Sequence, residues 1–217
     1  MTIDLYYSPA SSPCRSILLL GKTLGIHFNL IETRLCRGDN FRPEFSRINY
    51  EHSIPTLVDN GFALWESRAI LIYLADKYGK EDTLYPKNAQ RKAIVNQRLY
   101  FDMGTLFQRL ADCYLKPVIE KKPVDPQDSW KMEEAVGFLN IALAGHKYAA
   151  GDTMTIADFA LVATISTYEG LKFDLTPYAN VTKWFNRCKK HMRGYEINQR
   201  GVDDFVRTVA PLLPKTE

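Results

Sequence analysis

The residues best suited to chemistry lie near the amino terminus, in the segment Ser11-Ser12-Pro13-Cys14. Its length is that of the C-x-x-C motif of thiol redox proteins, but serine stands where the attacking cysteine would be. Serine has no thiol and cannot form a mixed disulfide. Two interpretations follow. In one, the Ser11 hydroxyl stabilises a thiolate that another molecule brings; in the other, Ser11 and Ser12 are only turn and capping residues.

The elements around this segment would place it at the start of a helix. Ile3–Tyr7 is an apolar run that predicts a strand, and Ile17–Leu24 predicts a helix. Pro13 suits the first helical turn, where its missing N–H would have had no partner, and Ser12 suits the N-cap position. Free N–H groups and the helix dipole at such a start favour an anion.

A second group of candidate residues flanks a predicted hairpin. Thr56–Val58 and Phe62–Leu64 read as strands joined by Asp59-Asn60-Gly61, whose residue types tolerate positive φ. Pro55 opens the first strand. It is either an ordinary trans proline or a cis proline that leaves neighbouring backbone groups free for a ligand. The next helix would start at Glu66-Ser67, with the serine as its N-cap.

The order of the predicted elements divides the chain into two parts. Residues 1–80 predict an α/β domain of βαβαββα order with a mixed four-stranded sheet, and its first strand-to-helix turn is where thioredoxin-like folds carry their motif. Residues 81–88 read as a linker. Residues 89–217 read as an all-α helical domain.

Local patterns refine this prediction. Ile26–Thr33 alternates as a half-buried strand would, and Leu35–Asn40 reads as a polar loop. Lys116-Pro117 should kink or end a long helix. Thr155–Asp158 forms a capping box before Phe159–Tyr168, which is apolar nearly all round and therefore predicts a buried central helix.

Composition narrows the function classes. The 217 residues are 46% hydrophobic, so a sizeable hydrophobic core is expected. The net charge is +3, which does not indicate a nucleic-acid-binding surface. No apolar run approaches the roughly 20 residues of a membrane span, and the amino terminus lacks signal-peptide features. Four scattered cysteines favour reduced thiols in the cytoplasm, and no metal-ligand spacing is present.

The whole chain resembles the cytosolic glutathione S-transferases, and in particular their insect delta class within the delta/epsilon group. Six segments in order carry the resemblance: Tyr6–Ser16, Asn49–Asp59, Ala63–Ile70, Asn96–Gly104, Tyr148–Asp152 and Thr155–Asp158. The resemblance implies a thioredoxin-like domain that binds glutathione, followed by a helical domain that supplies a hydrophobic substrate site. It favours the first interpretation of Ser11 over a purely structural one.

The resemblance also implies roles for individual residues. Ser11 would be catalytic, with its hydroxyl bonded to the glutathione sulfur, and glutathione, not serine, would be the nucleophile. Pro55 would be cis and free the Ile54 backbone for the cysteinyl part. The remaining glutathione contacts would be Glu66 to the γ-glutamyl amino group, Ser67 and its helix start to the γ-glutamyl carboxylate, Arg68 as added charge there, and His52 toward the glycyl end.

Three positions depart from the delta pattern. Asn40 stands where histidine is usual; it can still bond the glycyl carboxylate but brings no positive charge. Ala10 replaces a glycine and would strain the loop if that position needs φ > 0. Ser8 replaces a leucine and would make the floor of the electrophile pocket more polar.

The second substrate is expected between Ser11 and the first helices of the helical domain. Each aliphatic candidate has core packing as its alternative. The candidates are Ser12, Pro13, Leu35, Phe107, Leu110, Leu115, Val118, Ile119 and Phe205. Tyrosine is frequent in this class at the positions of Phe107, Cys113 and Leu115, so this pocket should favour apolar electrophiles.

The leading functional hypothesis is a homodimeric glutathione transferase that acts on small apolar electrophiles in detoxification, without a metal. Addition, substitution, halide elimination and peroxide reduction are all accessible to such a site. One alternative is a glutathione-dependent thiol oxidoreductase that uses Cys14; another is a non-catalytic ligand-binding module. The intact set of Ser11, His52, Pro55 and Glu66–Arg68 opposes the last alternative.

Overall fold

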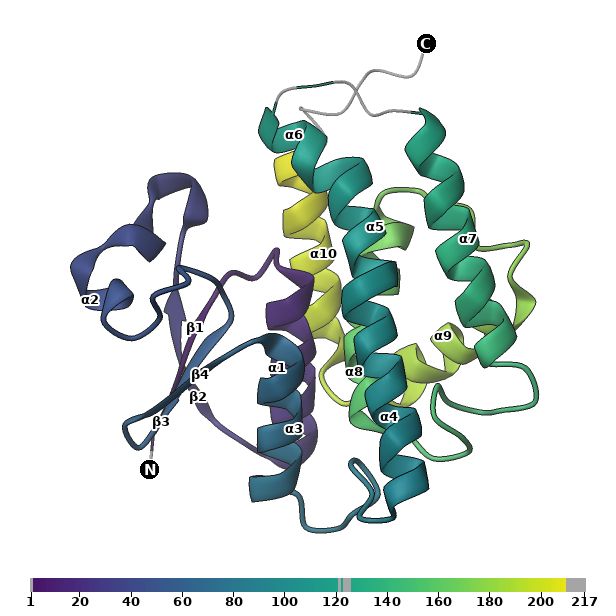
Figure 1. The fold of residues 1–217 in the computed structure, drawn as a ribbon, viewed down its shortest axis with the longest axis horizontal. Coiled ribbons are helices and arrows are strands. Elements are labelled where there is room, and N and C mark those ends of the chain that lie inside the picture. Colours follow the sequence, from purple (N-terminus) through teal and green to yellow (C-terminus); the bar gives the residue numbers. More distant parts are fainter. Residues whose placement is uncertain (1, 121, 123–125, 210–217) are drawn as a thin grey trace.

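The first part of the computed structural model is a mixed four-stranded sheet flanked by helices (Figure 1); the structure describes residues 2–120, 122 and 126–209. The sheet order is β2-β1-β3-β4, with β1 parallel to β2 and antiparallel to β3, and β3 antiparallel to β4. The βαβαββα prediction is confirmed. The elements are β1 (Ile3–Tyr7), α1 (Ser12–Leu24), β2 (Phe28–Glu32), α2 (Pro43–Ser46), β3 (Thr56–Asp59), β4 (Phe62–Trp65) and α3 (Ser67–Tyr78).

Two local predictions in this part were wrong. The segment expected to be a loop forms two 3-10 turns, Leu35–Arg37 and Asp39–Phe41. The alternating burial expected for β2 is absent, and Leu30 is 46% exposed. The alternation is lost because β2 is an edge strand of the sheet and its Leu30 side chain faces a cleft instead of the core.

The second part is helical and begins with one long, irregular path. It runs through α4 (Ala89–Phe101), a π-helical segment Asp102–Leu106, α5 (Phe107–Leu110), a second π-helical segment Ala111–Leu115, and α6 (Lys116–Glu120). Of the two expectations for Lys116-Pro117, that it ends this helix was wrong, because α6 continues through it to Glu120. The π segment that stops at Leu115, one residue before Lys116, is a wider turn, and such a turn accommodates a residue without an N–H.

Four more helices follow among the described residues: α7 (Pro126–Ala142), α8 (Ile156–Gly170), α9 (Ala179–His191) and α10 (Tyr195–Val209). The predicted capping box at the start of α8 is confirmed. The Asp158 carboxylate accepts hydrogen bonds from the backbone N–H groups of Ala149 and Thr155 and from the Trp184 ring. Every residue of α8 from Ile156 to Tyr168 is buried, as the sequence predicted.

The two parts meet along α1, which packs against both α8 and α10 (Figure 1). The backbones approach closely at Gly201 in α10, where an added Cβ would lie 2.3 Å from the Pro9 carbonyl oxygen. The catalytic candidate Ser11 therefore sits at the seam between the parts. The domain limits at residues 80 and 89 stay predictions. In the described part of the chain, no helix is long and apolar enough to cross a membrane.

Candidate active site

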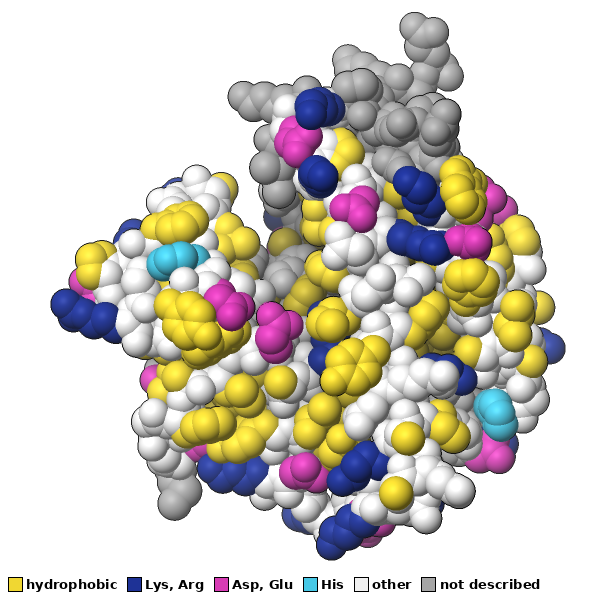
Figure 2. Space-filling view, in the orientation of Figure 1, with side chains coloured by type: hydrophobic (Ala, Val, Ile, Leu, Met, Phe, Trp, Pro, Cys, Tyr) yellow, Lys and Arg dark blue, Asp and Glu magenta, His cyan; other side chains and the backbone are white. Residues whose placement is uncertain are grey.

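A cleft of about 500 Å³ opens where the sheet-bearing part meets the helical part, and Figure 2 shows the surface hollowed between them. Residues from both parts line it. They are Ser8, Ala10, Ser11, Ser12, Pro13, Leu35, Ser53, Ile54, Pro55, Glu66, Ser67, Arg68, Met103, Phe107, Gln108, Leu110, Leu115, Thr167 and Phe205. The cleft thus collects most of the residues that the sequence singled out.

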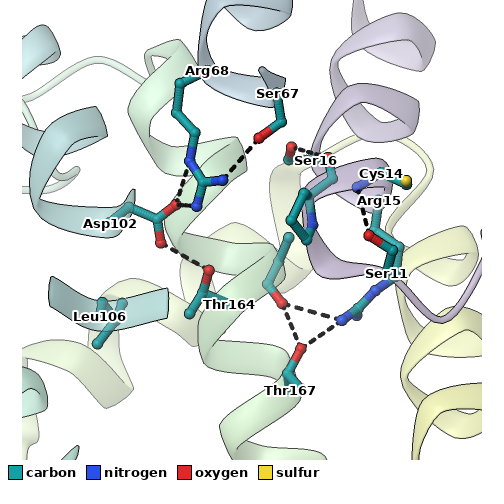
Figure 3. Close-up of polar contacts among 12 residues, drawn as sticks. Ser11, Cys14, Arg15, Ser16, Ser67, Arg68, Asp102, Leu106, Thr164 and Thr167 are labelled. Carbon is teal, nitrogen blue, oxygen red and sulfur yellow. Dashed lines mark hydrogen bonds and ion pairs between the residues drawn. The ribbon is translucent and has the colours of Figure 1, made fainter. Parts of the chain in front are cut away.

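Ser11 occupies the N-cap of α1 at the edge of this cleft. Its Oγ accepts a hydrogen bond from the Cys14 backbone N–H at 3.4 Å (Figure 3), and its own N–H donates to the Ser8 carbonyl at 3.1 Å. The prediction that Ser12 would be the N-cap was wrong by one residue, since Ser12 is the first helical residue. The shift places the Ser11 hydroxyl itself at the anion-favouring helix start.

Cys14 is not available as a redox thiol. Its side chain is fully buried in α1, and burial raises its pKa to about 11 despite the hydrogen bond to Ser11. A thiol with such a pKa is almost wholly protonated at neutral pH and is a poor nucleophile.

The opposite wall of the cleft holds two backbone features. The Ile54–Pro55 peptide bond is cis, which settles the choice that the sequence left open. Glu66 has φ 67° and ψ 102°, a positive φ that is uncommon for a residue with a side chain and often marks functional sites. Glu66, not Ser67 as predicted, is the N-cap of α3, and Ser67 is its first helical residue.

Arg68 lines the cleft while it is held from behind. Its guanidinium donates to Asp102 from Nε at 3.1 Å and also from a terminal nitrogen, and to the Ser67 hydroxyl at 2.8 Å. Asp102 is fully buried, and its other oxygen accepts from Thr164 of α8 at 2.8 Å (Figure 3). The Arg68 guanidinium also stacks over the Phe107 ring at 5.4 Å.

Asn40 and His52 lie beside each other but are not among the residues that line the cleft. The Asn40 side chain donates to the His52 carbonyl at 2.9 Å, and Nδ1 of His52 lies 2.8 Å from the Asn40 carbonyl. These bonds join the 3-10 turn Asp39–Phe41 to the segment before Pro55. In the structure the pair therefore braces a loop, and its predicted contact with glutathione stays a prediction.

The predicted electrophile wall is largely assembled. Seven of its nine members line the cleft, and the side chains of the other two, Val118 and Ile119 in α6, lie outside the described part of the structure. Sequence reasoning missed four lining residues: Ser53, Met103, Gln108 and Thr167. Met103 and Gln108 flank Phe107 on the same helical path, and this spacing could have identified them. Thr167 comes from the buried helix α8, where no sequence signal distinguished it.

Two residues of the loop before Ser11, Ala10 and Ser8, depart from the delta pattern, and both fit the structure. Ala10 is not among the residues with positive φ, so alanine fits without the strain that the sequence raised as a question. Ser8 lines the cleft, as expected for a residue of its floor.

Arg15 ties the Ser11 helix to the helical part from behind the cleft. Its side chain is fully buried and donates to Ser166 at 3.2 Å, to Thr167, and to the Asn198 side-chain oxygen at 2.9 Å. Burial lowers the pKa of the guanidinium to about 10. Its hydrogen-bond acceptors among the described residues are all neutral oxygens.

Family comparison agrees with this geometry. Residues 1–76 match the model of the glutathione S-transferase N-terminal domain, and residues 105–191 match that of the C-terminal domain. The chain therefore belongs to the glutathione S-transferase family and is a glutathione transferase.

Solved insect structures superpose on nearly the whole chain. A Nilaparvata lugens delta-class glutathione transferase is 46% identical, with a TM-score of 0.94 over 97% of this chain and 99% of that one. A Bombyx mori glutathione transferase is 40% identical, with a TM-score of 0.92 over 98% of each chain. A glutathione transferase homolog from Drosophila mojavensis, solved with bound glutathione, is 29% identical, with a TM-score of 0.91 over 98% of each chain.

Proposed function

We propose that the Ser11 hydroxyl donates a hydrogen bond to the sulfur of bound glutathione and so stabilises its thiolate. The observation that carries this proposal is the Ser11 N-cap position at the start of α1, facing the cleft. A free thiol has a pKa near 8.5, and lowering it by about two units requires about 2.7 kcal/mol. A hydrogen bond to a charged acceptor contributes about 1.5–3 kcal/mol and a helix start about 0.3–1 kcal/mol, which together reach that amount.

The cleft also supports a definite orientation of glutathione. Glu66 would bind the γ-glutamyl amino group, the Ser67 hydroxyl and the α3 start its carboxylate, and the Ile54 backbone beside cis Pro55 the cysteinyl unit. Arg68 would add positive charge near that carboxylate, since Asp102 and Ser67 take three of its five N–H donors and two remain. The glycyl end would extend toward His52 and Asn40.

For the reaction, an electrophile must then approach the glutathione thiolate along the opposite wall of the cleft. The thiolate sulfur forms a bond to the electrophilic carbon. In substitution, a halide leaves with the electron pair of its bond; in addition, the substrate takes up a proton. The wall contributed by Phe107, Leu110 and Phe205 is apolar, which favours apolar electrophiles.

Replacing Ser11 by alanine tests the mechanism. With 1-chloro-2,4-dinitrobenzene and glutathione, we expect kcat/KM at neutral pH to fall by about 10- to 100-fold, since one charged hydrogen bond is lost. The pH profile of kcat/KM should also move to higher pH. Thr23→Ala, which removes a hydroxyl on the same helix that donates to the Leu19 carbonyl, is the matched control. Full activity of Ser11→Ala would refute the assigned role.

Phe107 supports a preference for apolar substrates, and its variant tests that preference. Phe107→Tyr adds one hydroxyl to the cleft wall without changing the ring beneath Arg68. We expect kcat/KM to rise severalfold for electrophiles that carry a hydrogen-bonding group, relative to apolar ones of the same size. Steady-state rates across such matched pairs measure the ratio, and an unchanged ratio would contradict the proposed preference.

We propose that two copies pair through the face that carries α3 and α4. Hydrophobic side chains gather on this face in Figure 2. Tyr50 is 71% exposed with its ring edge-on to Trp65, and Tyr100 is 70% exposed. Surfaces of this kind usually mark interaction sites. Light scattering should give a dimer mass, and Tyr50→Arg/Tyr100→Arg should give monomers; a monomeric wild type would refute the pairing.

The finer assignments are proposals of the same kind. The 46% identity to a delta-class enzyme supports delta class, and the small number and wide spacing of the four cysteines support a cytoplasmic location. Glutathione as the co-substrate is supported by the family and by the bound glutathione of the Drosophila mojavensis homolog. In the described part of the chain, no three His, Cys, Asp or Glu residues are grouped as metal ligands.

A further inference from the structure

Arg15 is a buried cation that lies directly behind the loop that carries Ser11. Its backbone N–H donates to the Ser11 carbonyl at 3.0 Å, in the first turn of α1. An added Cβ at Gly201 of α10 would lie 2.3 Å from the Pro9 carbonyl oxygen and 2.4 Å from Cδ of Arg15, so these two groups are close neighbours. The Arg15 side chain therefore runs along the back of the segment that precedes Ser11.

The far end of the Arg15 side chain reaches a wall of the active-site cleft. One terminal nitrogen of the guanidinium donates to the Thr167 hydroxyl of α8 (Figure 3). Thr167 and Ser11 both line the cleft. A single hydroxyl group therefore separates this positive charge from the space in which glutathione and its electrophile would react.

No neighbouring acid neutralises the charge of Arg15 in the described part of the chain. The titratable groups whose charges act on it are Tyr195 of α10 and Cys14 of its own helix, and burial raises the pKa of both, so both are uncharged at neutral pH. Glu169 of α8, which acts on Tyr195, is bonded by Lys189 at 2.6 and 2.7 Å. The Arg15 guanidinium is thus held by dipoles alone.

The other charged side chains at the cleft do not favour an anion near Ser11. Glu66 and Arg68 line the cleft with opposite charges, and Arg68 is paired with the buried carboxylate of Asp102. With both carboxylates ionised, these three side chains carry one net negative charge. Arg15 compensates that charge, and its field is screened less in the protein interior than it would be in water.

Under the proposed function, in which glutathione binds with its sulfur at Ser11, we propose that Arg15 supplies positive potential that stabilises the thiolate without touching it. A nearby opposite charge favours the ionised form of a thiol. Because α8 and α10 hold the guanidinium in place before glutathione binds, no reorganisation is needed as the negative charge forms. Burial lowers the pKa of Arg15 to about 10, so the side chain is still a cation at neutral pH.

The ultraviolet absorbance of the bound glutathione thiolate, titrated with pH, tests this role. We expect Arg15→Met to raise the pKa of the bound thiol by about one unit, so kcat/KM falls by up to about tenfold at neutral pH and recovers at alkaline pH. Arg15→Lys keeps the charge and should keep the pKa close to the wild-type value, although it loses the guanidinium fork and therefore stability. A purely structural role would change stability and activity but not the thiol pKa. An unchanged pKa in Arg15→Met overturns the proposal.

Asn198→Asp tests the same charge without removing it. The Asn198 side-chain oxygen already accepts a hydrogen bond from Arg15 at 2.9 Å, and aspartate has nearly the same shape, so the new carboxylate would pair with the cation where it stands. We expect the pKa of the bound thiol to rise as in Arg15→Met, with no loss of stability. This variant decides the matter if Arg15→Met fails to fold, and an unchanged thiol pKa in it refutes the proposal.

Two further variants separate the role of Arg15 from that of Ser11 and from general charge effects. If Ser11→Ala leaves the thiol pKa unchanged while Arg15→Met raises it, the proposed role of Ser11 fails and that of Arg15 is supported; the reverse result overturns only the role of Arg15. Arg187→Met removes an arginine of α9 that donates to the Lys147 carbonyl and does not line the cleft, and we expect an unchanged pKa. An equal rise in Arg187→Met would assign the effect to net charge and overturn the proposal.

Discussion

Two arginines connect the sheet-bearing part to the helical part, and they differ in the charge of their hydrogen-bond partners. Arg68 meets a buried carboxylate, Asp102, which Thr164 of α8 also bonds. Arg15 is fully buried with only neutral acceptors, on α8 and on α10. Figure 3 shows both arginines reaching toward α8, from α3 and from α1.

The difference lies in what each arginine would leave behind. Without Arg68, a fully buried carboxylate loses its counter-ion, which is among the costliest changes in a protein interior. Without Arg15, only hydroxyl and amide oxygens lose a donor, and some keep another bond; Ser166, for example, still bonds the Ala163 carbonyl at 3.0 Å. The lowered pKa of Arg15 shows that the protein stabilises this cation less than water does.

The largest expected effect is therefore at Arg68. Arg68→Met should lower the free energy of unfolding by about 3–5 kcal/mol, because the Asp102 carboxylate stays buried and unpaired. Urea unfolding at fixed protein concentration measures this loss. Arg68→Met/Asp102→Leu, which removes both charges, should recover most of it. If the double variant is as unstable as the single one, the charge pair is not the source of the loss.

A smaller effect is expected at Arg15. Arg15→Met should cost about 1–3 kcal/mol, the penalty for buried neutral acceptors that lose a donor.

Lysine substitutions sharpen the contrast. Arg68→Lys keeps a cation beside Asp102 and should lose less than Arg68→Met. Arg15→Lys keeps the charge but lacks the guanidinium fork that reaches Ser166, Thr167 and Asn198 together, so it should lose at least as much as Arg15→Met. A stable Arg15→Lys protein would mean that charge, not geometry, matters at this position.

The smallest effect is expected at Asp59, a carboxylate whose cation is half-exposed. Burial alone would raise its pKa, but hydrogen bonds from Lys77, Tyr78 and Tyr73 lower it to about 2. Because the folded pKa lies below the unfolded value of 3.8, the stabilisation is present above that value and is lost as pH falls toward about 2.

Thermal melts at several pH values should show this loss as about 1–2 kcal/mol, reduced by solvent screening at Lys77. Asp59→Asn should flatten the dependence in that window. The same acid dependence in the variant would assign it to other carboxyl groups.

Much of the fold was predictable because its signals are local. The hairpin around Asp59-Asn60-Gly61, the capping box at Thr155–Asp158 and the uniformly apolar α8 each depend on neighbouring residues, and each was confirmed. The failures depend on what packs nearby. Whether Leu30 faces a core cannot be read from β2 alone, and the π turn that accommodates Pro117 leaves no pattern in the sequence.

The residues of the site also divide into those that local sequence signals predict and those that they do not. Ser11, Pro55 and Glu66 lie at strand ends and helix starts, and the resemblance to a family predicts a role for each; all three line the cleft. Thr167 and Arg15 could not be found this way. They act across more than 140 residues of sequence, and α8 contributes Thr167 from a helix that looked like plain core.

Ala10 has a consequence for the chain before it folds. In the unfolded state, glycine samples far more backbone conformations than alanine does, so alanine loses less conformational entropy when the loop becomes ordered. Since Ala10 is free of positive φ, this gain has no opposing strain in the folded loop and amounts to about 0.4–1 kcal/mol. In the unfolded chain, the segment before Ser11 therefore samples fewer conformations that differ from the folded loop than it would with glycine at this position.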